Sequence, residues 1–216
     1  ELGSTRIKAV LLNAERQIVE TGDCTWKSKL EHGVWTYPMD DVQAGLQTAL
    51  GNLGALPGEI SAMGISGMMH GYLAFDKDWN LLAPFRTWQN TMTGEAADKL
   101  TDAFGFNIPQ RWSVAHLYQA VLNGEAHVRS IAHITTLAGY VHYLLTGENA
   151  VGIGEASGMF PIDSRTLMYD AAMLDKFDML TSEYDFDWTI RSVLPAVLTA
   201  GQAAGTLTEA GSRYLH

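Results

Sequence analysis

The sequence predicts a domain of the α/β class. Two short β-rich segments, residues 7–13 and 18–21, lie on either side of a polar turn near the start of the chain. Strand-like segments then alternate with apolar stripes at helical spacing, which dominate the second half. The chain has 216 residues, 47% of them hydrophobic and 18% charged, so it can bury the core of one large domain. An early hairpin followed by alternating strands and helices is typical of this class.

In the first half of the chain, an irregular loop is expected over residues 30–38, after the hairpin. Asp40 is the predicted N-cap of the helix that follows, and "LPGE" at 56–59 is its predicted stop. The apolar face of this helix is Val42, Leu46, Leu50 and Leu53. Residues 60–66 are a predicted strand leading into a glycine-bracketed loop, and residues 72–76 and 81–88 a predicted hairpin.

The second half contains three further helical patterns. Ser113 is the predicted cap of a helix with a complete apolar stripe that stops at Gly124. Residues 133–147 read as a short strand followed by a helix that ends at Gly147, and residues 204–216 as a short helix. The glycine-rich segment 152–163 is expected to form a loop leading into a strand, not a helix.

Composition excludes several classes of function. A net charge of −10 argues against a surface for nucleic acid or an anionic membrane, since either needs a basic face. No apolar run approaches the roughly 20 residues that span a bilayer. Cys24 stands alone, which excludes an internal disulfide framework and favours a reducing cytoplasm. The abrupt start at Glu1 suggests an excised piece, and homo-oligomerisation stays open.

The first eight residues, "ELGSTRIK", have the residue types that hold an anion. Gly3 lets the backbone approach a ligand closely, while Ser4 and Thr5 offer hydroxyl and N–H groups. Lys8 supplies a compact positive charge that suits phosphate, and Glu1 could hold the hydration shell of Mg²⁺. The alternative interpretation is a plain turn between strands.

Other common catalytic motifs are missing from the sequence. Seven histidines are present, but none forms a His-x-x-His or Glu-x-x-His pair, so a protein-ligated zinc site is not expected. Neither a Gly-x-Ser-x-Gly elbow nor a Walker lysine loop occurs.

A second element follows the anion-binding turn at residues 67–71, Gly-Met-Met-His-Gly. Together the two resemble the FGGY family of carbohydrate kinases, in the sugar kinase/heat-shock-70/actin superfamily. That family begins with an Asp-x-Gly-Thr-Ser/Thr-x-x-Lys/Arg turn, and its xylulokinases have a Gly-Gln-Met-His-Gly loop. The resemblance continues in matching order through "LLAPFRTWQN" at 81–90, "SVAHLYQAVL" at 113–122 and residues 145–163.

The resemblance implies a ribonuclease H-like fold of the actin/hexokinase type, with a mixed central sheet flanked by helices. Residues 1–216 would be the N-terminal sugar-binding domain, and the C-terminal ATP-binding domain would lie outside this sequence. ATP and Mg²⁺ are the implied cofactors. By the same resemblance, Gly3, Ser4, Thr5 and Lys8 would lie near the terminal phosphate of ATP. Glu1 stands in place of the family's aspartate and would serve Mg²⁺ through water.

The implied sugar-binding residues come from three separate segments. Met69 and His70 match residues that contact sugar hydroxyls in xylulokinase-like members. Trp88 could cover the apolar face of a carbohydrate, with Gln89 bonding to hydroxyls, and Arg111 lies at another edge of the sugar site in relatives. The alternative interpretations are a structural role for His70 and a core position for Trp88.

Several positions depart from the family pattern. Two of them, Asn90 and Met92, replace a family aspartate and arginine, which weakens any assignment to a specific sugar. Met68 replaces glutamine and is expected to pack in the core; His116 replaces lysine; and Glu155, which replaces aspartate or asparagine, is expected to be structural.

The implied reaction is ATP-dependent phosphorylation of a sugar or polyol hydroxyl. It needs a proton acceptor for the attacking oxygen. The family's aspartate for this role belongs to a Gly-Gly-x-Asp stretch that follows the segment ending here, so no catalytic residue is assigned and the fragment alone is expected to be inactive. The alternative function is a non-catalytic sugar sensor or assembly module of the same fold.

Overall fold

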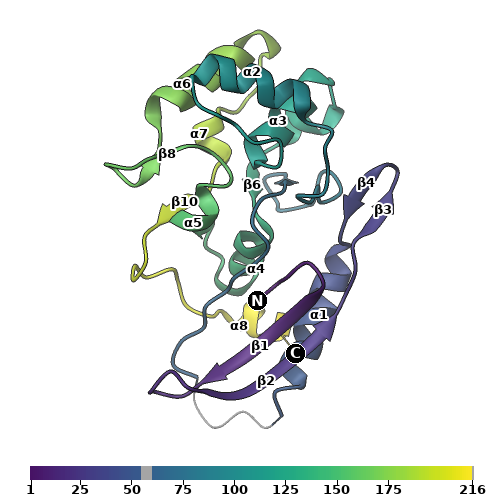
Figure 1. Ribbon diagram of the computed structural model, residues 1–216, viewed down its shortest axis with the longest axis vertical. Helices are drawn as coiled ribbons and strands as arrows, with labels where there is room; N and C mark the ends of the chain where they lie inside the picture. Colours follow the sequence, from purple (N-terminus) through teal and green to yellow (C-terminus); the bar gives the residue numbers. More distant parts are fainter. Residues whose placement is uncertain (55–59, 216) are drawn as a thin grey trace.

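A computed structural model describes residues 1–54 and 60–215 of the chain. Figure 1 shows an elongated molecule: a long hairpin and a helix at one end, a group of helices at the other, and α4 between them. Strand pairing is mixed but short, because the described strands form two-stranded ladders of which β7–β10 is parallel and the others are antiparallel. No helix in these ranges is both long and apolar enough to span a bilayer.

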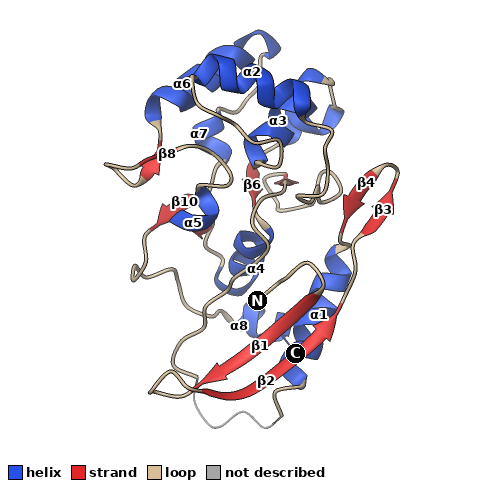
Figure 2. Cartoon of the chain, in the orientation of Figure 1, coloured by secondary structure: helices blue, strands red, loops and turns tan. Residues whose placement is uncertain are grey.

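The first half contains the strands β1 (Arg6–Leu12), β2 (Ile18–Thr25), β3 (Lys29–Glu31), β4 (Val34–Thr36) and β5 (Leu73–Phe75), and the helices α1 (Met39–Gly51) and α2 (Gly94–Phe104). The second half contains α3 (Ser113–Leu122), β6 (His133–Thr135), α4 (Leu137–Thr146), β7 (Ala150–Gly152), α5 (Ile153–Ala156), β8 (Ile162–Asp163), β9 (Met168–Tyr169), α6 (Ala171–Thr181), α7 (Ile190–Val193), β10 (Ala196–Leu198) and α8 (Glu209–Leu215), with two 3₁₀ turns, Ala126–Ser130 and Ser182–Tyr184. Figure 2 shows how helices predominate in this half.

The hairpin β1–β2 carries α1 on one face, at the lower right of Figure 1. Two glycines set how closely they pack. A Cβ on Gly22 would lie 2.1 Å from the carbonyl oxygen of Ala49, and one on Gly45 would lie 2.5 Å from the Ile7 side chain. Because only a residue without a side chain fits at these points, the hairpin and the helix come together nearly backbone to backbone.

Strand β5 separates two hydrophobic cores. Side chains alternate along a strand, so successive residues face opposite sides. Leu73 and Phe75 belong to the core beneath β1 and α1, together with Leu2, Ile7 and Met68. On the other side, Tyr72 and Ala74 belong to the core of the helical end, which includes Leu100, Leu117, Phe104, Phe160 and Phe177. The residues just before β5 therefore lie on the boundary between the two cores.

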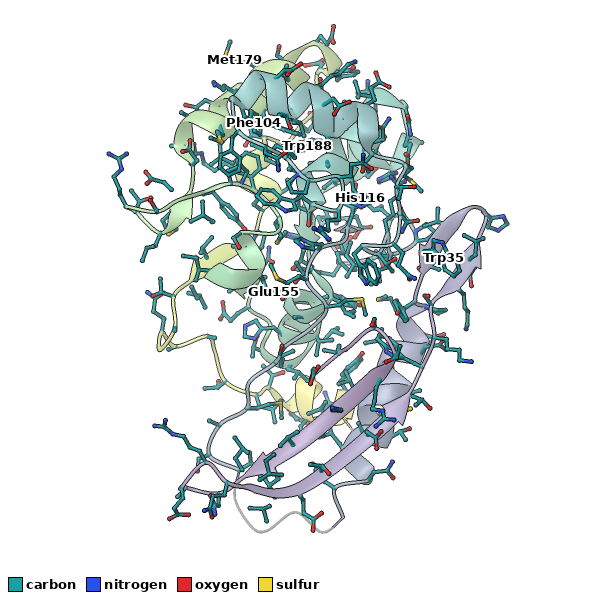
Figure 3. All side chains as sticks on the ribbon, viewed as in Figure 1. Trp35, Phe104, His116, Glu155, Met179 and Trp188 are labelled. Atoms are coloured by element: carbon teal, nitrogen blue, oxygen red, sulfur yellow. The ribbon has the colours of Figure 1, made fainter. Side chains whose placement is uncertain are left out.

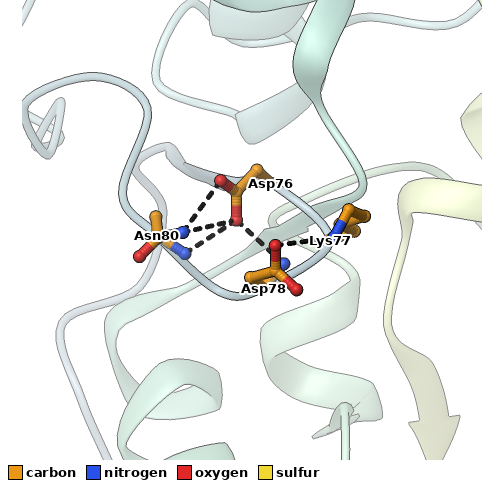
Figure 4. A network of polar contacts seen from close by, with 4 residues as sticks. All are labelled: Asp76, Lys77, Asp78 and Asn80. Carbon is orange, nitrogen blue, oxygen red and sulfur yellow. Dashed lines mark hydrogen bonds and ion pairs between the residues drawn. The ribbon is translucent and has the colours of Figure 1, made fainter.

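The turn after β5 is closed by one carboxylate. Asp76 accepts hydrogen bonds from the backbone N–H groups of Asp78 and Asn80 and from the Asn80 side chain, as Figure 4 shows. This turn presents Trp79, whose ring stacks on Tyr143 of α4 at 3.5 Å between centroids and on His133 of β6 at 4.4 Å. The aromatic stack attaches the turn to the middle of the molecule.

The helical end is closed by α2, α3, α6 and α7. Figure 3 shows Phe104 and Trp188 among its side chains and Met179 on its outside. Trp188 donates a hydrogen bond from Nε1 to the carbonyl oxygen of Val128 at 2.8 Å, which joins the segment before α7 to the 3₁₀ turn after α3.

Most of the predicted elements are confirmed. The first two strands lie where the sequence places them, although β2 runs on to Thr25. Helix α1 buries Val42, and Leu53 after it is buried as well. Helix α4 ends at Gly147, which takes the left-handed conformation with φ +78°, and α8 forms in the tail. The predicted 72–76/81–88 hairpin is present as two isolated bridges, Tyr72 to Arg86 and Phe75 to Leu81.

Two predictions for the first half are wrong. Residues 30–38 hold the hairpin β3–β4 instead of an irregular loop, because His32 and Gly33 have φ values of +49° and +81° that suit a tight hairpin turn. Asp40 lies inside the first turn of α1 and does not cap it, since Pro38 precedes the helix. Asp40 and Asp41 instead place negative charge at the positive end of the helix dipole. The predicted stop at 56–59 lies outside the described residues.

Three further predictions are corrected by long-range contacts. Residues 60–66 form no strand, and only the bridge between Leu2 and Gly67 pairs this segment with the chain start. Ser113 is the first residue of α3, not its cap, because its hydroxyl donates to the carbonyl oxygen of Gly71 at 2.6 Å. The glycine-rich segment 152–163 includes the one-turn helix α5, with Ala156 buried in the helical core, although it does lead into a strand, β8, as predicted.

Candidate functional site

The front turn is fixed through its carbonyl groups. Trp26, at the end of β2, donates from its ring Nε1 to the carbonyl oxygen of Gly3 at 2.7 Å, and from its backbone N–H to Thr5 at 3.2 Å. The hydroxyl of Tyr37 donates to the carbonyl oxygen of Ser4 at 2.6 Å. Burial raises the pKa of Tyr37, which keeps that hydroxyl protonated as a donor. The two rings pack together with centroids 4.2 Å apart, so one aromatic pair holds three consecutive carbonyls.

The N–H side of the same turn stays open. Gly3 closes the turn by donating to the carbonyl oxygen of Arg6 at 3.0 Å. Within residues 1–54 and 60–215, the backbone N–H groups of Ser4 and Thr5 donate to no protein oxygen, and both residues are exposed. Successive free N–H groups in a turn form an anion-binding concavity. The turn therefore fits the terminal phosphate that the sequence predicts for it.

The turn lies directly beside the glycine-bracketed loop. Leu2 donates to the carbonyl oxygen of Ser66 at 2.8 Å and accepts from the N–H of Met68 at 2.9 Å. These two hydrogen bonds place the first residues of the chain along residues 66–68, more than sixty positions later in the sequence. A cavity of about 330 Å³ lies where these two segments meet. It is lined by Glu1, Leu2, Gly3, Ser4, Ser66, Gly67, Met68, Met69 and Trp88.

This cavity joins residues from both halves of the predicted site. Glu1, Gly3 and Ser4 come from the phosphate side, and Met69 and Trp88 from the sugar side. The other predicted residues lie outside its lining. Thr5 and Lys8 are exposed on the turn and β1, and His70 and Gln89 directly follow lining residues. Arg111 is exposed just before α3. The structure thus brings the two predicted motifs into one hollow and leaves several of their side chains at its edge.

Trp88 and Met69 present apolar surface at this cavity. Trp88 is 42% exposed and Met69 is 44% exposed. Trp88 is therefore not a core aromatic, which was the alternative interpretation of the sequence. Met68, by contrast, is buried in the core beneath β1, as predicted for a packing residue.

His70 is held by a glycine that the sequence analysis did not single out. Its Nδ1 lies 3.5 Å from the carbonyl oxygen of Gly158, and a Cβ on Gly158 would lie 2.7 Å from that nitrogen. The backbone of His70 is left-handed, with φ +70°. Burial lowers the pKa of His70, and the Arg111 guanidinium lowers it further. The lowered pKa favours the neutral imidazole at pH 7, in which one ring nitrogen is a donor and the other an acceptor.

The loop containing His70 is anchored at its second glycine. The N–H of Gly71 donates to the carbonyl oxygen of Arg111 at 3.3 Å, and its carbonyl accepts from the Ser113 hydroxyl. These bonds connect the His70 loop to the start of α3. Residues 70 and 111 are brought together by the backbone, and only the fold reveals this contact.

Gln89 and Asn90, which follow Trp88, differ in role. Gln89 is half-buried, and its buried Oε1 has no hydrogen-bond partner within the described ranges. Asn90 is buried and forms two hydrogen bonds with the backbone of Trp35 in β4. Its Oδ1 accepts from the N–H of Trp35 at 2.9 Å, and its Nδ2 donates to the carbonyl oxygen of Trp35 at 2.8 Å. An ionised aspartate could not donate the second bond, so the amide explains this departure from the family pattern.

Two other departures are buried titratable groups, both labelled in Figure 3. Burial lowers the pKa of His116 to about 3, so this histidine is neutral. Glu155 is mostly buried, which raises its pKa, and Thr136 hydrogen-bonds to it. Neither residue lines the cavity beside the front turn. Met92, where the family has arginine, is 38% exposed.

Glu1 is the carboxylate nearest the turn, and it fits a hydrated magnesium ion. It is exposed, lines the cavity, and its Oε1 lies within 3.7 Å of the position of a Cβ on Gly3. A lone carboxylate suits Mg²⁺, which keeps several of its waters. No cluster of three or more His, Cys, Asp or Glu side chains in the described ranges could enclose a metal.

A larger hollow of about 1100 Å³ is lined in part by residues 60–65. Its walls come from α4, the segment from β7 to α5, and residues 198–207, and they are mainly apolar. It is lined by part of segment 145–163, including Glu155, but by none of the residues predicted to bind phosphate or sugar. The smaller cavity beside the front turn is therefore the candidate active site.

Comparison with known proteins finds carbohydrate kinases. The xylulose kinase of Klebsiella pneumoniae is 26% identical over 226 residues, which cover 96% of this chain and 43% of that protein. A glycerol kinase of Thermococcus kodakarensis is 23% identical, over 94% of this chain and 42% of its own. The solved structure of ligand-bound xylulose kinase from Lactobacillus acidophilus superposes with a TM-score of 0.83 at 16% identity, over 99% of this chain and 44% of that one.

The comparisons confirm the actin/hexokinase-type fold expected from the sequence, and a gluconate kinase from Lactobacillus acidophilus also shares it, with a TM-score of 0.82. The chain spans less than half the length of the curated relatives it matches. A family model for the N-terminal domain of the FGGY carbohydrate kinases matches residues 1–215. The chain therefore belongs to the FGGY family of carbohydrate kinases, and it corresponds to their N-terminal domain.

Proposed function

We propose that this chain is the sugar-holding part of an ATP-dependent kinase that phosphorylates a hydroxyl group of a sugar or polyol. The observation that carries the proposal is the cavity shared by the front turn and the glycine-bracketed loop. An anion-binding turn and a group of polar and aromatic side chains must lie side by side if a phosphoryl group is to pass from a nucleotide to a sugar.

On the phosphate side, the free N–H groups and hydroxyls of Ser4 and Thr5 bind the terminal phosphate, and Lys8 adds positive charge. ATP supplies the phosphoryl group, and Mg²⁺ neutralises its charge. Glu1 holds the waters of that ion. Because Trp26 and Tyr37 fix the carbonyls of the turn, its donors are already oriented before the nucleotide arrives.

On the sugar side, neutral His70 and Gln89 bond to hydroxyl groups, while Trp88 and Met69 cover an apolar face of the substrate. Arg111 lies at the edge of this group and contributes the nearby positive charge. None of these residues is assigned as the base. We place the proton acceptor in the part of the kinase that lies outside residues 1–216, together with the adenine-binding domain.

Closure of the two domains would exclude water, so that the sugar hydroxyl and not water receives the phosphoryl group. We propose the cytoplasm as the location of this reaction, since ATP is the phosphoryl donor and a single cysteine is compatible with a reducing compartment. Residues 1–216 alone would bind substrate groups without turning them over.

The test is sugar-dependent ADP release by the full-length protein across a panel of ketoses, polyols and aldonates. Release with at least one member of the panel supports the kinase. Sugar binding by calorimetry without ADP release would instead assign the chain to a non-catalytic sensor of the same fold.

A further inference from the structure

A group of buried polar side chains lies behind the candidate sugar site. Its members are Tyr72, Arg86, Glu125 and His127, which we call the buried clamp. The Arg86 side chain is only 7% exposed, and its Nη2 forms an ion pair with Oε2 of Glu125. His127 approaches the same oxygen at 3.5 Å, and the Tyr72 hydroxyl lies 2.9 Å from Nε2 of His127. The guanidinium of Arg86 lies 5.5 Å from the centre of the Tyr72 ring.

The buried clamp touches each segment that carries a predicted sugar-binding residue. Tyr72 follows His70 by two positions, and Arg86 precedes Trp88 by two. Their backbones pair in both directions, with Tyr72 donating to Arg86 at 2.8 Å and Arg86 donating to Tyr72 at 3.1 Å. On the third segment, His116 of α3 stacks on Tyr72 at 6.3 Å, five positions after Arg111.

The energetics of the buried clamp do not favour a purely stabilising role. A buried ion pair loses so much solvation that apolar side chains of similar size often serve stability as well or better. Arg86 also leaves Nε and Nη1, and His116 leaves both ring nitrogens, without a hydrogen-bond partner within residues 1–54 and 60–215. Unpartnered buried groups of this kind reduce stability.

Geometry is what the ion pair supplies. A guanidinium held by a carboxylate has a fixed direction, whereas an apolar side chain can settle in several rotamers. Glu125 is itself held, since its Oε1 accepts from Nδ2 of Asn123 at 3.2 Å. The series of contacts Asn123–Glu125–Arg86 therefore sets where the segment before Trp88 lies against the His70 loop.

We infer that Arg86 is a positioning residue for the sugar site, acting through the buried clamp to set the spacing of His70, Trp88 and Arg111. This inference rests on the proposed kinase function. It predicts that loss of the ion pair weakens sugar binding while the phosphate side keeps its affinity for ATP, since Trp26 and Tyr37 hold that side through hydrogen bonds that do not involve Arg86 or Glu125.

The test uses two variants of the full-length protein, Arg86→Met and the double variant Arg86→Met/Glu125→Met. The single variant leaves the Glu125 carboxylate without its ion-pair partner and should lower the melting temperature. The double variant removes both charges and should regain most of the wild-type melting temperature. In both, we expect the KM for the sugar to rise about tenfold and the KM for ATP to change less than about twofold.

The control variant is Trp188→Phe, which removes the bond to Val128 from the same hydrophobic core without touching the three sugar-site segments. It should lower the melting temperature and leave the sugar KM unchanged. Tyr72→Phe is a milder second variant that removes only the bond to His127; we expect it to raise the sugar KM about threefold. A folded double variant with the wild-type sugar KM would overturn the inference, as would an unchanged KM in Tyr72→Phe if the double variant does not fold.

The wild-type protein separates this inference from the proposed function. If it binds a sugar without releasing ADP, the kinase proposal fails, but the dissociation constants of the same variants still measure positioning. A wild-type protein that binds no sugar overturns both.

Discussion

The front turn and the His70 loop line one cavity, yet they are built in different ways. The turn is continuous in sequence, and its three carbonyls are held by Trp26, just after β2, and Tyr37, just after β4. The His70 loop is held by Gly158, Arg111 and Ser113, which lie forty or more residues away. A site for phosphate can be made by a short motif, whereas a site for a sugar needs segments that only the complete fold brings together.

The difference extends to charge and burial. Behind the sugar side lie His116 and the buried clamp, so the position of His70 depends on groups that respond to pH and to substitution. The front turn depends on the ring N–H of Trp26 and the hydroxyl of Tyr37, which do not ionise near neutrality. Substitutions should therefore act separately on the affinities for ATP and for sugar.

The largest effect is expected from Gly158→Ala in the full-length protein. The new Cβ would lie 2.7 Å from Nδ1 of His70, so the imidazole must move. A displacement of about an ångström at a substrate-contacting group can reduce turnover about 100-fold, and we expect that loss in kcat/KM for the sugar. Gly154→Ala is the matched control, because its Cβ would meet no atom within 4 Å. Equal kinetics for the two variants would contradict this role of Gly158.

Acid should destabilise the sugar side first. The pKa of His116 falls from 6.5 to about 3 on folding, so the unfolded chain binds a proton that the folded chain excludes. The stability that this gives is present above pH 6.5 and is lost as the pH falls towards 3, by roughly 1.4 kcal/mol per pH unit. Urea unfolding between pH 7 and pH 5 should show a shallower pH dependence for His116→Phe than for the wild type. The same pH dependence of stability in both proteins would exclude His116 as the source of the acid destabilisation.

His70→Ala should affect the sugar and spare the fold. We expect the sugar KM to rise, or kcat to fall, by more than about tenfold, because a neutral imidazole at the cavity edge bonds to hydroxyls. His32→Ala is the control, since His32 also has a positive φ but lies at the tip of the β3–β4 hairpin. Unchanged kinetics, or a large loss of melting temperature in His70→Ala, would refute the assignment.

The smallest effect is expected on the phosphate side. The double variant Trp26→Phe/Tyr37→Phe keeps an aromatic ring at both positions but frees the carbonyls of Gly3 and Ser4. A hydrogen bond contributes about 1 kcal/mol net, so a looser turn should raise the KM for ATP about fivefold. The sugar KM should stay within about twofold of the wild type. A larger change in the sugar KM than in the KM for ATP would contradict the separate support of the two sides of the cavity.

The sequence is enough to predict what depends on neighbouring residues. The strands at 7–13 and 18–21, the helix ending at Gly147 and the turn at 3–5 follow from local patterns, and the structure contains each of them. Anion binding by that turn stays a prediction. Ser113 shows the limit, because a serine before an apolar stripe predicts a cap, yet its hydroxyl bonds to Gly71. Residues 60–66 have a strand pattern but form no strand.

The residues that line or border the candidate site could be predicted from the sequence, but the residues that hold them in position could not. Met69, His70 and Trp88 could be selected because the family pattern marks them. Gly158 could not, since nothing in a glycine-rich segment shows which glycine will face a histidine 88 positions away. Arg86 and Glu125 likewise look like surface charges in the sequence, and their burial becomes apparent only when β5, α3 and the turn after it pack together.

The most direct test is a crystal structure of the full-length protein with Mg²⁺, a non-hydrolysable ATP analogue and the sugar that gives the highest turnover. The account predicts that the terminal phosphate accepts hydrogen bonds from the N–H groups of Ser4 and Thr5, with the receiving hydroxyl in the cavity between Gly3 and Met69. A sugar bound against His70 but separated from the phosphate by protein, or a phosphate bound away from the turn, would contradict it.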